Sequence, residues 1–365
     1  IPFVKSFINN RIYDKLQDYQ FVNSSLEDLK NISYADFILF GKKIELKEDK
    51  SIEGIKLLEL IYDLEGKQFE AYKLIFSNAN LIKENKMNIE NEIQKYTDLL
   101  HYKPQIILQG PPGTGKTREA KRIAKALLGL GENDSLEGNE QFKLIQFHPS
   151  YSYEDFVRGI VAKPNEEGNG IVYTAENKIL GTFAKEALKD KDKPYVLVID
   201  EINRANLSAV LGELIYALEY RGEAVQSMYA IDGENNLILP PNLYIIGTMN
   251  TADRSVGHID YAIRRRFAFV NILPKDLTNE LGDQFEGTLF AKVTNLFNTN
   301  LSPEFKKEEV QLGHSYFITK NTPINIRWEY EIKPILFEYV KDGILVGEGI
   351  ETTINNLIND ENNAS

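Results

Sequence analysis

The segment from Gly110 to Thr117 has the residue types and the spacing to bind phosphate groups. It matches the pattern G-x-x-x-x-G-K-[ST] at every position, with the residues Gly110, Pro111, Pro112, Gly113, Thr114, Gly115, Lys116 and Thr117. Glycines let backbone N–H groups point at phosphate oxygens, and the dipole of a following helix adds partial positive charge. In such a loop the lysine reaches the β- and γ-phosphates and the last hydroxyl ligates Mg²⁺. The segment therefore predicts a nucleoside triphosphate site, with Lys116 on the phosphates and Thr117 on the metal.

Two acidic residues follow the apolar run from Val196 to Ile199. They are Asp200 and Glu201, and they come directly after what reads as a buried strand. In a parallel sheet the carboxyl ends of the strands lie at one edge, where ligands bind. Asp200 would hold Mg²⁺, and Glu201 would orient and deprotonate an attacking water. Such a pair alone is more often a surface feature, but together with the complete phosphate loop it predicts hydrolysis of the triphosphate.

A polar group also ends the apolar run from Leu243 to Met249. Asn250 stands directly after that run, and Asp253 follows three residues later. A polar side chain at the end of a strand between the two motifs can hold the catalytic water, and we expect Asn250 to do so, with Asp253 as the second candidate. Asparagine also forms turns at strand ends, so this alternative stays open.

Three consecutive arginines, Arg264, Arg265 and Arg266, stand out in a protein whose formal net charge is −12. Cations at the end of a helix form an ordinary solvated face. An arginine can also reach the γ-phosphate bound by a neighbouring subunit, where it stabilises charge in the transition state. A contact with nucleic acid is a third interpretation. The hydrolytic motifs favour the second, and Arg265 and Arg266 are the candidates.

These residues need a scaffold that brings strand ends together. Apolar runs at Ile106–Leu108, Lys143–Phe147, Tyr195–Ile199 and Leu243–Met249 predict strands. Residues Arg118–Leu128 and Leu207–Glu219 have apolar side chains at helical spacing. Alternating strands and helices predict an α/β fold, in which helices flank a parallel sheet.

The chain divides into five regions by pattern. We expect a small mixed α+β region over 1–80, a helical connector over 81–102, the NTPase core over 103–274, a helical region over 275–355 and a disordered tail over 356–365. In the C-terminal region helices are predicted at Thr288–Phe297 and Ile324–Val340. Two segments of the N-terminal region, 42–47 and 68–76, read as strands.

The N-terminal region offers no clear chemistry. Asp36, Glu45 and Lys47 match a loose nuclease pattern, and so do residues 63–67, but a chain rich in lysine and glutamate makes such matches by chance. Its aromatic residues suit a core better than a platform for a flipped base. Residues 1–80 are therefore a candidate module for target recognition or partner binding, with no assigned role.

Composition excludes several classes of protein. The chain has 365 residues, no cysteine and four histidines, which excludes disulfides and cysteine-ligated zinc and disfavours a histidine-rich metal site. The negative charge argues against a surface that attracts nucleic acid throughout. The sequence has no apolar run that could span a bilayer and no signal-peptide pattern, so we expect a cytoplasmic protein without a membrane partner.

The motifs in this order resemble the AAA+ superfamily, and their exact residues closely resemble the McrB family. The matching segments are Phe147–Phe156, Asp200–Ser208, Met249–Ser255, Arg264–Phe267 and Gly313–Phe317. The resemblance covers about residues 100–345. It implies an AAA+ domain with a C-terminal helical lid. It also implies assembly in a ring, a hexamer, with nucleotide at each subunit interface.

The family resemblance also implies a function. McrB proteins are GTP-hydrolysing motor subunits of modification-dependent restriction systems that act on DNA, and a separate McrC subunit carries the nuclease and stimulates hydrolysis. The positions of Arg204 and Arg265 are implicated at the subunit interface in that family. DNA recognition there belongs to a variable N-terminal domain, which residues 1–80 do not match.

The residues alone leave alternatives open. A phosphate loop does not distinguish GTP from ATP. An ATP-driven remodeller of protein complexes, similar to the MoxR proteins, would use the same catalytic residues. A nucleotide-gated binding ring with slow turnover is the third hypothesis. His148 and His314 lie in family-like segments, and for both a packing role is favoured over chemistry.

Overall fold

A computed structural model describes residues 91–165, 169–253 and 259–358 of this protein. The chain divides into two compact units, 1–90 and 91–365, and every described residue belongs to the second. The strands predicted at 42–47 and 68–76, the nuclease-like matches and the end of the predicted tail therefore lie outside the described residues. Residues 91–102 are helical, in agreement with the described part of the predicted connector.

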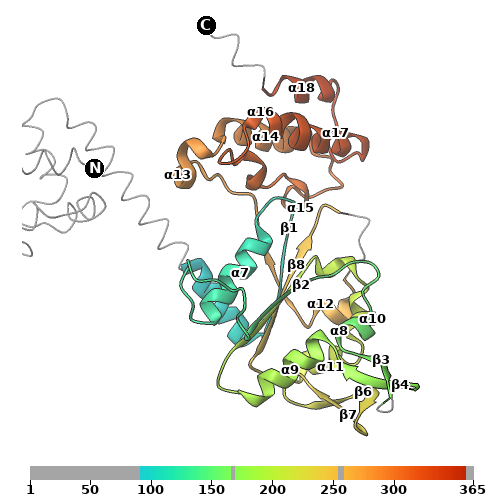
Figure 1. Ribbon diagram of the computed structural model, residues 1–365. Coiled ribbons are helices and arrows are strands. Elements are labelled where there is room, and N and C mark those ends of the chain that lie inside the picture. The colour runs from blue at the N-terminus through green and yellow to red at the C-terminus, as the bar shows by residue number, and fades with distance from the viewer. Residues whose placement is uncertain (1–90, 166–168, 254–258, 359–365) are drawn as a thin grey trace, which may run out of the picture. The chain divides into compact units, whose positions relative to one another are not determined.

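A five-stranded parallel sheet lies at the centre of the second unit (Figure 1). Its strands, in spatial order, are β2 (Phe142–Gln146), β5 (Tyr195–Asp200), β8 (Leu243–Asn250), β1 (Gln105–Gly110) and β9 (Ala268–Asn271). The four predicted strands are confirmed, and the short strand β9 was missed. Register places Gly110 beside Asn250 and Gln146 beside Asp200. The carboxyl ends of the predicted site strands therefore meet at one edge.

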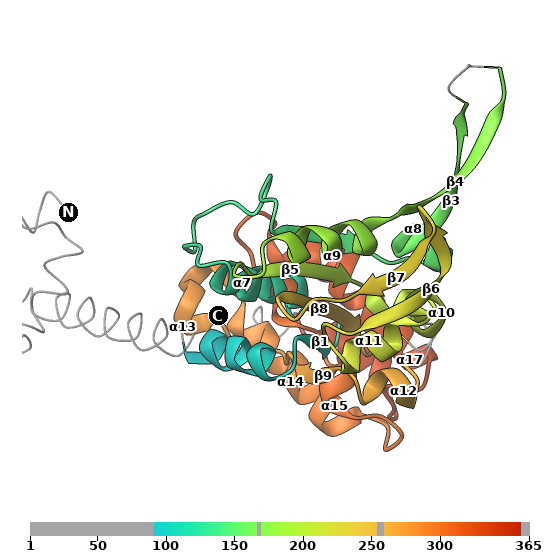
Figure 2. The same cartoon turned by 90° about the horizontal axis from the view of Figure 1, so that it is seen from below.

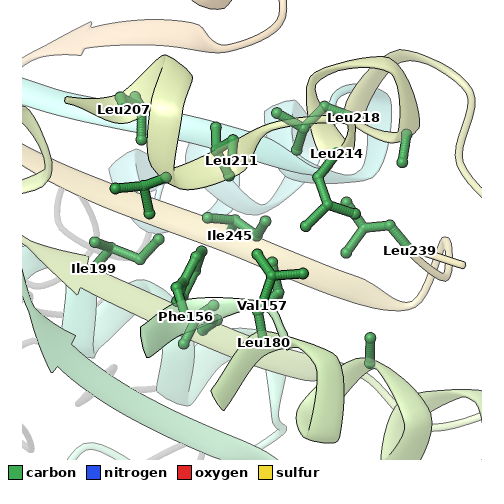
Figure 3. Packing of buried hydrophobic residues seen from close by; sticks show 14 of the residues in the cluster. Phe156, Val157, Leu180, Ile199, Leu207, Leu211, Leu214, Leu218, Leu239 and Ile245 are labelled. Atoms are coloured by element: carbon green, nitrogen blue, oxygen red, sulfur yellow. The ribbon is translucent and has the colours of Figure 1, made fainter. Parts of the chain in front are cut away.

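Helices cover both faces of the sheet. Helix α7 (Lys116–Leu127) packs Ala120, Ile123 and Ala124 on one face, where the helical residues 91–102 add Tyr96 and Leu100. The other face is covered by α8 (Tyr153–Phe156), α9 (Ile179–Lys189), α10 (Leu207–Leu211) and α11 (Leu214–Glu219). Figure 3 shows leucines of α10 and α11 directed at β8 and its neighbours. The continuous apolar strands are explained by this burial on both faces.

The prediction of one continuous helix over Leu207–Glu219 is wrong. The structure has α10 and α11 instead, separated at Gly212, whose φ is 50°. A side chain at that position would be strained, and the ring of Tyr153 lies 3.1 Å from where its Cβ would be. Both short helices bury their leucines in the same core. The apolar periodicity therefore continues across the break and conceals it.

Two antiparallel hairpins were also missed. They are β3 (Arg158–Pro164) with β4 (Ile171–Asn177), and β6 (Ala224–Ile231) with β7 (Glu234–Ile238). Figure 2 shows the β3–β4 hairpin extending away from the sheet. Apolar side chains on it stay exposed, so it lacks the alternation of buried and exposed residues on which a strand prediction depends.

The C-terminal residues form a second, helical core. Its largest helices are α14 (Gly287–Asn300) and α17 (Lys333–Lys341), and the predicted helix at Thr288–Phe297 is confirmed as part of α14. The predicted helix at Ile324–Val340 is present as α16 (Ile324–Arg327), the π-helical η6 (Trp328–Ile332) and α17. The smaller elements of this region are α13 (Thr278–Leu281), α15 (Lys307–Val310), α18 (Ile350–Asn356), η4 (Gly282–Gln284) and η5 (His314–Phe317). Two further short elements, α12 (Tyr261–Arg264) and η3 (Ile202–Arg204), pack in the core of the sheet. In the part of the chain that the structure describes, every helix is too short or too polar to cross a membrane.

The central core provides a test of this packing. Phe156 is fully buried, and its ring contacts Phe147 at 5.2 Å between centroids. Phe156→Ala is expected to lower the free energy of unfolding by about 3–5 kcal/mol, because it removes buried apolar surface and leaves a cavity. Urea denaturation measures the loss. As a control, Tyr173→Ala on the exposed hairpin should change stability by less than about 0.5 kcal/mol. Equal effects of the two substitutions would contradict this packing.

Candidate active site

The phosphate loop connects β1 to α7 at the carboxyl edge of the sheet. Gly113 and Gly115 both have a φ of 78°, in the left-handed region that favours glycine. A Cβ on Gly110 would lie 2.2 Å from the carbonyl oxygen of Ile272, and one on Gly113 would lie 2.5 Å from the ring of Tyr316. Three glycines of the motif are therefore required by the backbone and by close neighbours.

The Lys116 ammonium group lies under this loop and is almost completely buried. Its Nζ donates hydrogen bonds to the carbonyl oxygens of Gly110 (2.9 Å) and Pro111 (2.8 Å) and to Oδ1 of Asn250 (2.9 Å). Burial lowers the pKa of Lys116 to about 8, and the nearby carboxylates of Glu201 and Asp200 only partly oppose this. The ammonium group is thus positioned at the loop by three hydrogen-bond acceptors, which phosphate oxygens could replace.

Asp200 and Thr117 lie together, as predicted. The Thr117 hydroxyl donates to Oδ1 of Asp200 at 2.7 Å, and the Thr248 hydroxyl donates to the same oxygen at 2.5 Å. A hydroxyl and a carboxylate oxygen at this spacing fit Mg²⁺, which binds few protein oxygens and keeps several waters. Thr248 was not predicted. Its signal was a polar residue inside an otherwise apolar strand.

The side chain of Glu201 is positioned from several directions. Its backbone φ is 52°, unusual for a residue with a side chain, and its N–H donates to the Thr248 hydroxyl at 3.2 Å. The Asn250 amide lies 3.4 Å from Oε1, and Nε of Arg204 donates to Oε2 at 3.0 Å. A strained backbone held by such contacts is common where a side chain must be aimed.

Asn250 links the two halves of the site, because its Oδ1 contacts Lys116 while its amide nitrogen faces Glu201. Arg204 in turn lies 3.4 Å from a carboxylate oxygen of Asp253. Asn203, which sequence reasoning did not single out, is buried beside the Asn250 backbone. Its side-chain oxygen has no hydrogen-bond partner among the described residues.

The arginine run lies elsewhere. Arg265 follows α12 with its side chain 67% exposed, 3.7 Å from Glu219. The Arg266 side chain is only 9% exposed and contacts the same carboxylate at 3.0 Å and the carbonyl of Ala262 at 2.7 Å. Within the described ranges, neither arginine forms a hydrogen bond or ion pair with the phosphate loop or the acid pair of its own chain. The Arg265 side chain is therefore exposed at the surface, whereas the Arg266 side chain is turned inward.

The C-terminal helical region contacts the phosphate loop directly. The N–H groups of Gly313 and Ser315 donate to the carbonyl oxygens of Pro112 and Gly113, each at 2.9 Å. His314 lies between them, whereas His148 is exposed with its ring against Tyr151. We call residues 313–315 the lid strap. Its two bonds place His314 beside the phosphate loop. His148 makes a packing contact instead.

Comparison with known proteins finds a matching family model and related sequences. A family model described as an AAA domain of the dynein-related subfamily matches residues 105–267. The McrB subunit of the Escherichia coli K12 type IV methyl-directed restriction enzyme EcoKMcrB is 38% identical over 276 residues, which cover 69% of this chain and 57% of that protein. YdiS, a component of the type II restriction enzyme BsuMI of Bacillus subtilis 168, is 26% identical over 45% of this chain and 55% of its own length.

The chain therefore spans somewhat over half the length of both curated relatives. Among solved structures, a RuvB mutant from Thermotoga maritima superposes with a TM-score of 0.29 at 18% identity, covering 75% of this chain and 68% of that one.

The low pKa of Lys116 leads to a pH dependence of nucleotide binding. Bound phosphates would favour the charged lysine and raise its pKa above the value of about 8 in the free site. Below that pH the lysine is already charged. Above it, binding must take up a proton, so affinity is expected to fall by up to about tenfold per pH unit. Titrations between about pH 7 and pH 9.5 measure this, and calorimetry in two buffers would detect the proton uptake. A constant affinity across this range would contradict the assignment.

Proposed function

Because this chain belongs to the McrB family of AAA+ proteins, we propose that it is the GTP-hydrolysing motor subunit of a modification-dependent DNA restriction system. It would act as a homo-oligomeric ring, a hexamer by family resemblance, with a separate McrC-like nuclease subunit. The observation that carries this proposal is the joined set of Lys116, Asn250, Glu201 and Asp200 at one sheet edge, in a chain 38% identical to McrB of E. coli.

The proposed reaction is in-line attack of water on the γ-phosphorus, with cleavage of the bond to the bridging oxygen. Glu201 orients the water and accepts its proton, while Asn250 aligns it. Lys116 exchanges its loop carbonyls for phosphate oxygens and offsets their charge. Thr117 and Asp200 would hold Mg²⁺, which would supply further neutralisation of the phosphate charge.

Arginines complete the proposed site from two directions. Arg204 holds the Glu201 carboxylate and pairs with Asp253, so both would set the position of the general base. Arg265 is proposed to reach the γ-phosphate of the adjacent subunit, which its exposure permits. Arg266 is proposed to hold the Glu219 carboxylate in place, and that carboxylate in turn positions Arg265. These roles require a ring, because Arg265 has no contact with the site of its own described chain.

The choice of GTP rests on the family, because the phosphate contacts are the same for any purine triphosphate. DNA would be contacted by the ring or by residues 1–80, which lie outside the described residues. An ATP-driven remodeller and a slowly cycling binding ring remain as outcomes that the next experiment distinguishes.

Steady-state hydrolysis with each nucleotide tests the proposed substrate. Purified protein with Mg²⁺ is expected to hydrolyse GTP and not ATP, and an McrC-like partner should accelerate the reaction. Chelation of Mg²⁺ should abolish turnover, because Thr117 and Asp200 would lose the metal that neutralises the phosphates. Turnover of ATP alone would support the MoxR-like alternative. Slow GTP turnover unaffected by the partner would support the binding ring.

Mixing of two inactive variants tests whether Arg265 acts across the interface. Glu201→Gln should bind nucleotide and assemble but lose turnover, and Arg265→Ala should lower turnover by on the order of a thousandfold or more. In mixed rings some sites combine an intact Glu201 with an intact Arg265 from the neighbour. GTP hydrolysis should therefore reappear on mixing. If mixtures stay as inactive as each variant alone, Arg265 does not act in trans.

A further inference from the structure

The lid strap places the imidazole of His314 over the first residues of α7. Nε2 of His314 lies 3.6 Å from the Cβ position that Gly115 lacks. Gly115 is the N-cap residue of α7, and the backbone N–H groups at such a helix start bind phosphate. The main-chain bonds of Gly313 and Ser315 to the loop fix this placement from both sides.

The hydrogen bond at Nδ1 of His314 identifies which ring nitrogen carries the proton. Nδ1 accepts the backbone N–H of Lys275 at 3.3 Å, so it has no hydrogen of its own. Burial, with further contributions from Lys275 and Arg118, lowers the pKa of His314 to about 4, and the ring is therefore neutral at pH 7. The single ring hydrogen must then be on Nε2. Among the described residues, Nε2 has no hydrogen-bond partner.

We propose that Nε2–H of His314 donates a hydrogen bond to a non-bridging oxygen of the α- or β-phosphate of the bound nucleotide. The inference rests on the nucleotide site of the proposed function and adds a contact from the C-terminal helical region to it. The cationic groups of Lys275 and Arg118 near the ring favour an anionic acceptor. A hydrogen bond between a neutral donor and an ionised oxygen is stronger than one between neutral groups.

The position of His314 assigns the contact to the phosphates that di- and triphosphates share. The γ-phosphate side of the site is occupied by Lys116, Asn250 and Glu201 at the ends of β8 and β5. His314 lies instead over Gly115, at the loop N–H groups that cradle the α- and β-phosphates. The C-terminal helical region would thus sense whether any nucleotide is bound, and the acid pair would distinguish triphosphate from diphosphate.

Nucleotide titrations of the full chain test the proposal. The dissociation constants of fluorescent GDP and GTP are measured for the wild type, His314→Ala, His314→Gln and His101→Ala. Glutamine can present an N–H near the position of Nε2, whereas alanine cannot. His101 is a matched control. It precedes β1 and so lies at the edge of the sheet opposite the phosphate loop, where its exposed imidazole contacts Tyr244 of β8. Thermal unfolding of each variant confirms that it is folded.

His314→Ala is expected to weaken GDP and GTP by the same factor, on the order of tenfold. His314→Gln should recover a large part of the affinity, and His101→Ala should bind like the wild type. Unchanged affinity of His314→Ala would overturn the inference, as would a loss confined to GTP or a glutamine variant as weak as the alanine variant. If the wild type binds no GDP, GTP, ADP or ATP, the proposed function itself fails. If it binds and His314→Ala does not differ, only this inference fails.

Discussion

The site depends on a buried ammonium group whose hydration shell is replaced by oxygen atoms of the protein. The Lys116 ammonium group is held by two carbonyls of its own loop and by the Asn250 side chain from the neighbouring strand. Burying an unpaired charge is costly, so these oxygens are needed to keep the lysine in place. The same contacts tie the loop after β1 to the end of β8. The geometry of the loop and the position of Asn250 are therefore coupled through one ammonium group.

Much of this arrangement could be predicted because its causes are local. The phosphate loop needs glycines at particular positions, and the buried strands need continuous apolar runs, so both leave a direct signal. The association of Asp200, Thr117 and Asn250 followed from the rule that parallel strands end at one edge. The difference in exposure between Arg265 and Arg266 could not be predicted from the sequence, because adjacent identical residues differ only in what surrounds them after folding.

Other features of the structure were not predicted from the sequence, for identifiable physical reasons. Strand β9 has only four residues, and none of them is fully buried, so it carries little apolar pattern. The turn between β6 and β7 does have a readable signal in Asp232 and Gly233, which both have positive φ as a tight hairpin requires. The break at Gly212 is concealed by a shared core on both sides. The contact of the C-terminal helices with the loop depends on tertiary packing between segments about 200 residues apart, which no local pattern indicates.

The two hydrogen bonds of the lid strap run from main chain to main chain. Side-chain replacements at 313 and 315 therefore leave these donors intact, and among the common amino acids only proline would remove one. The steric limits are much stricter, because a Cβ on Gly313 would lie 2.0 Å from the Gly113 carbonyl carbon. The main-chain contact between the two cores therefore requires glycine at position 313 and does not depend on the identity of the side chain at position 315.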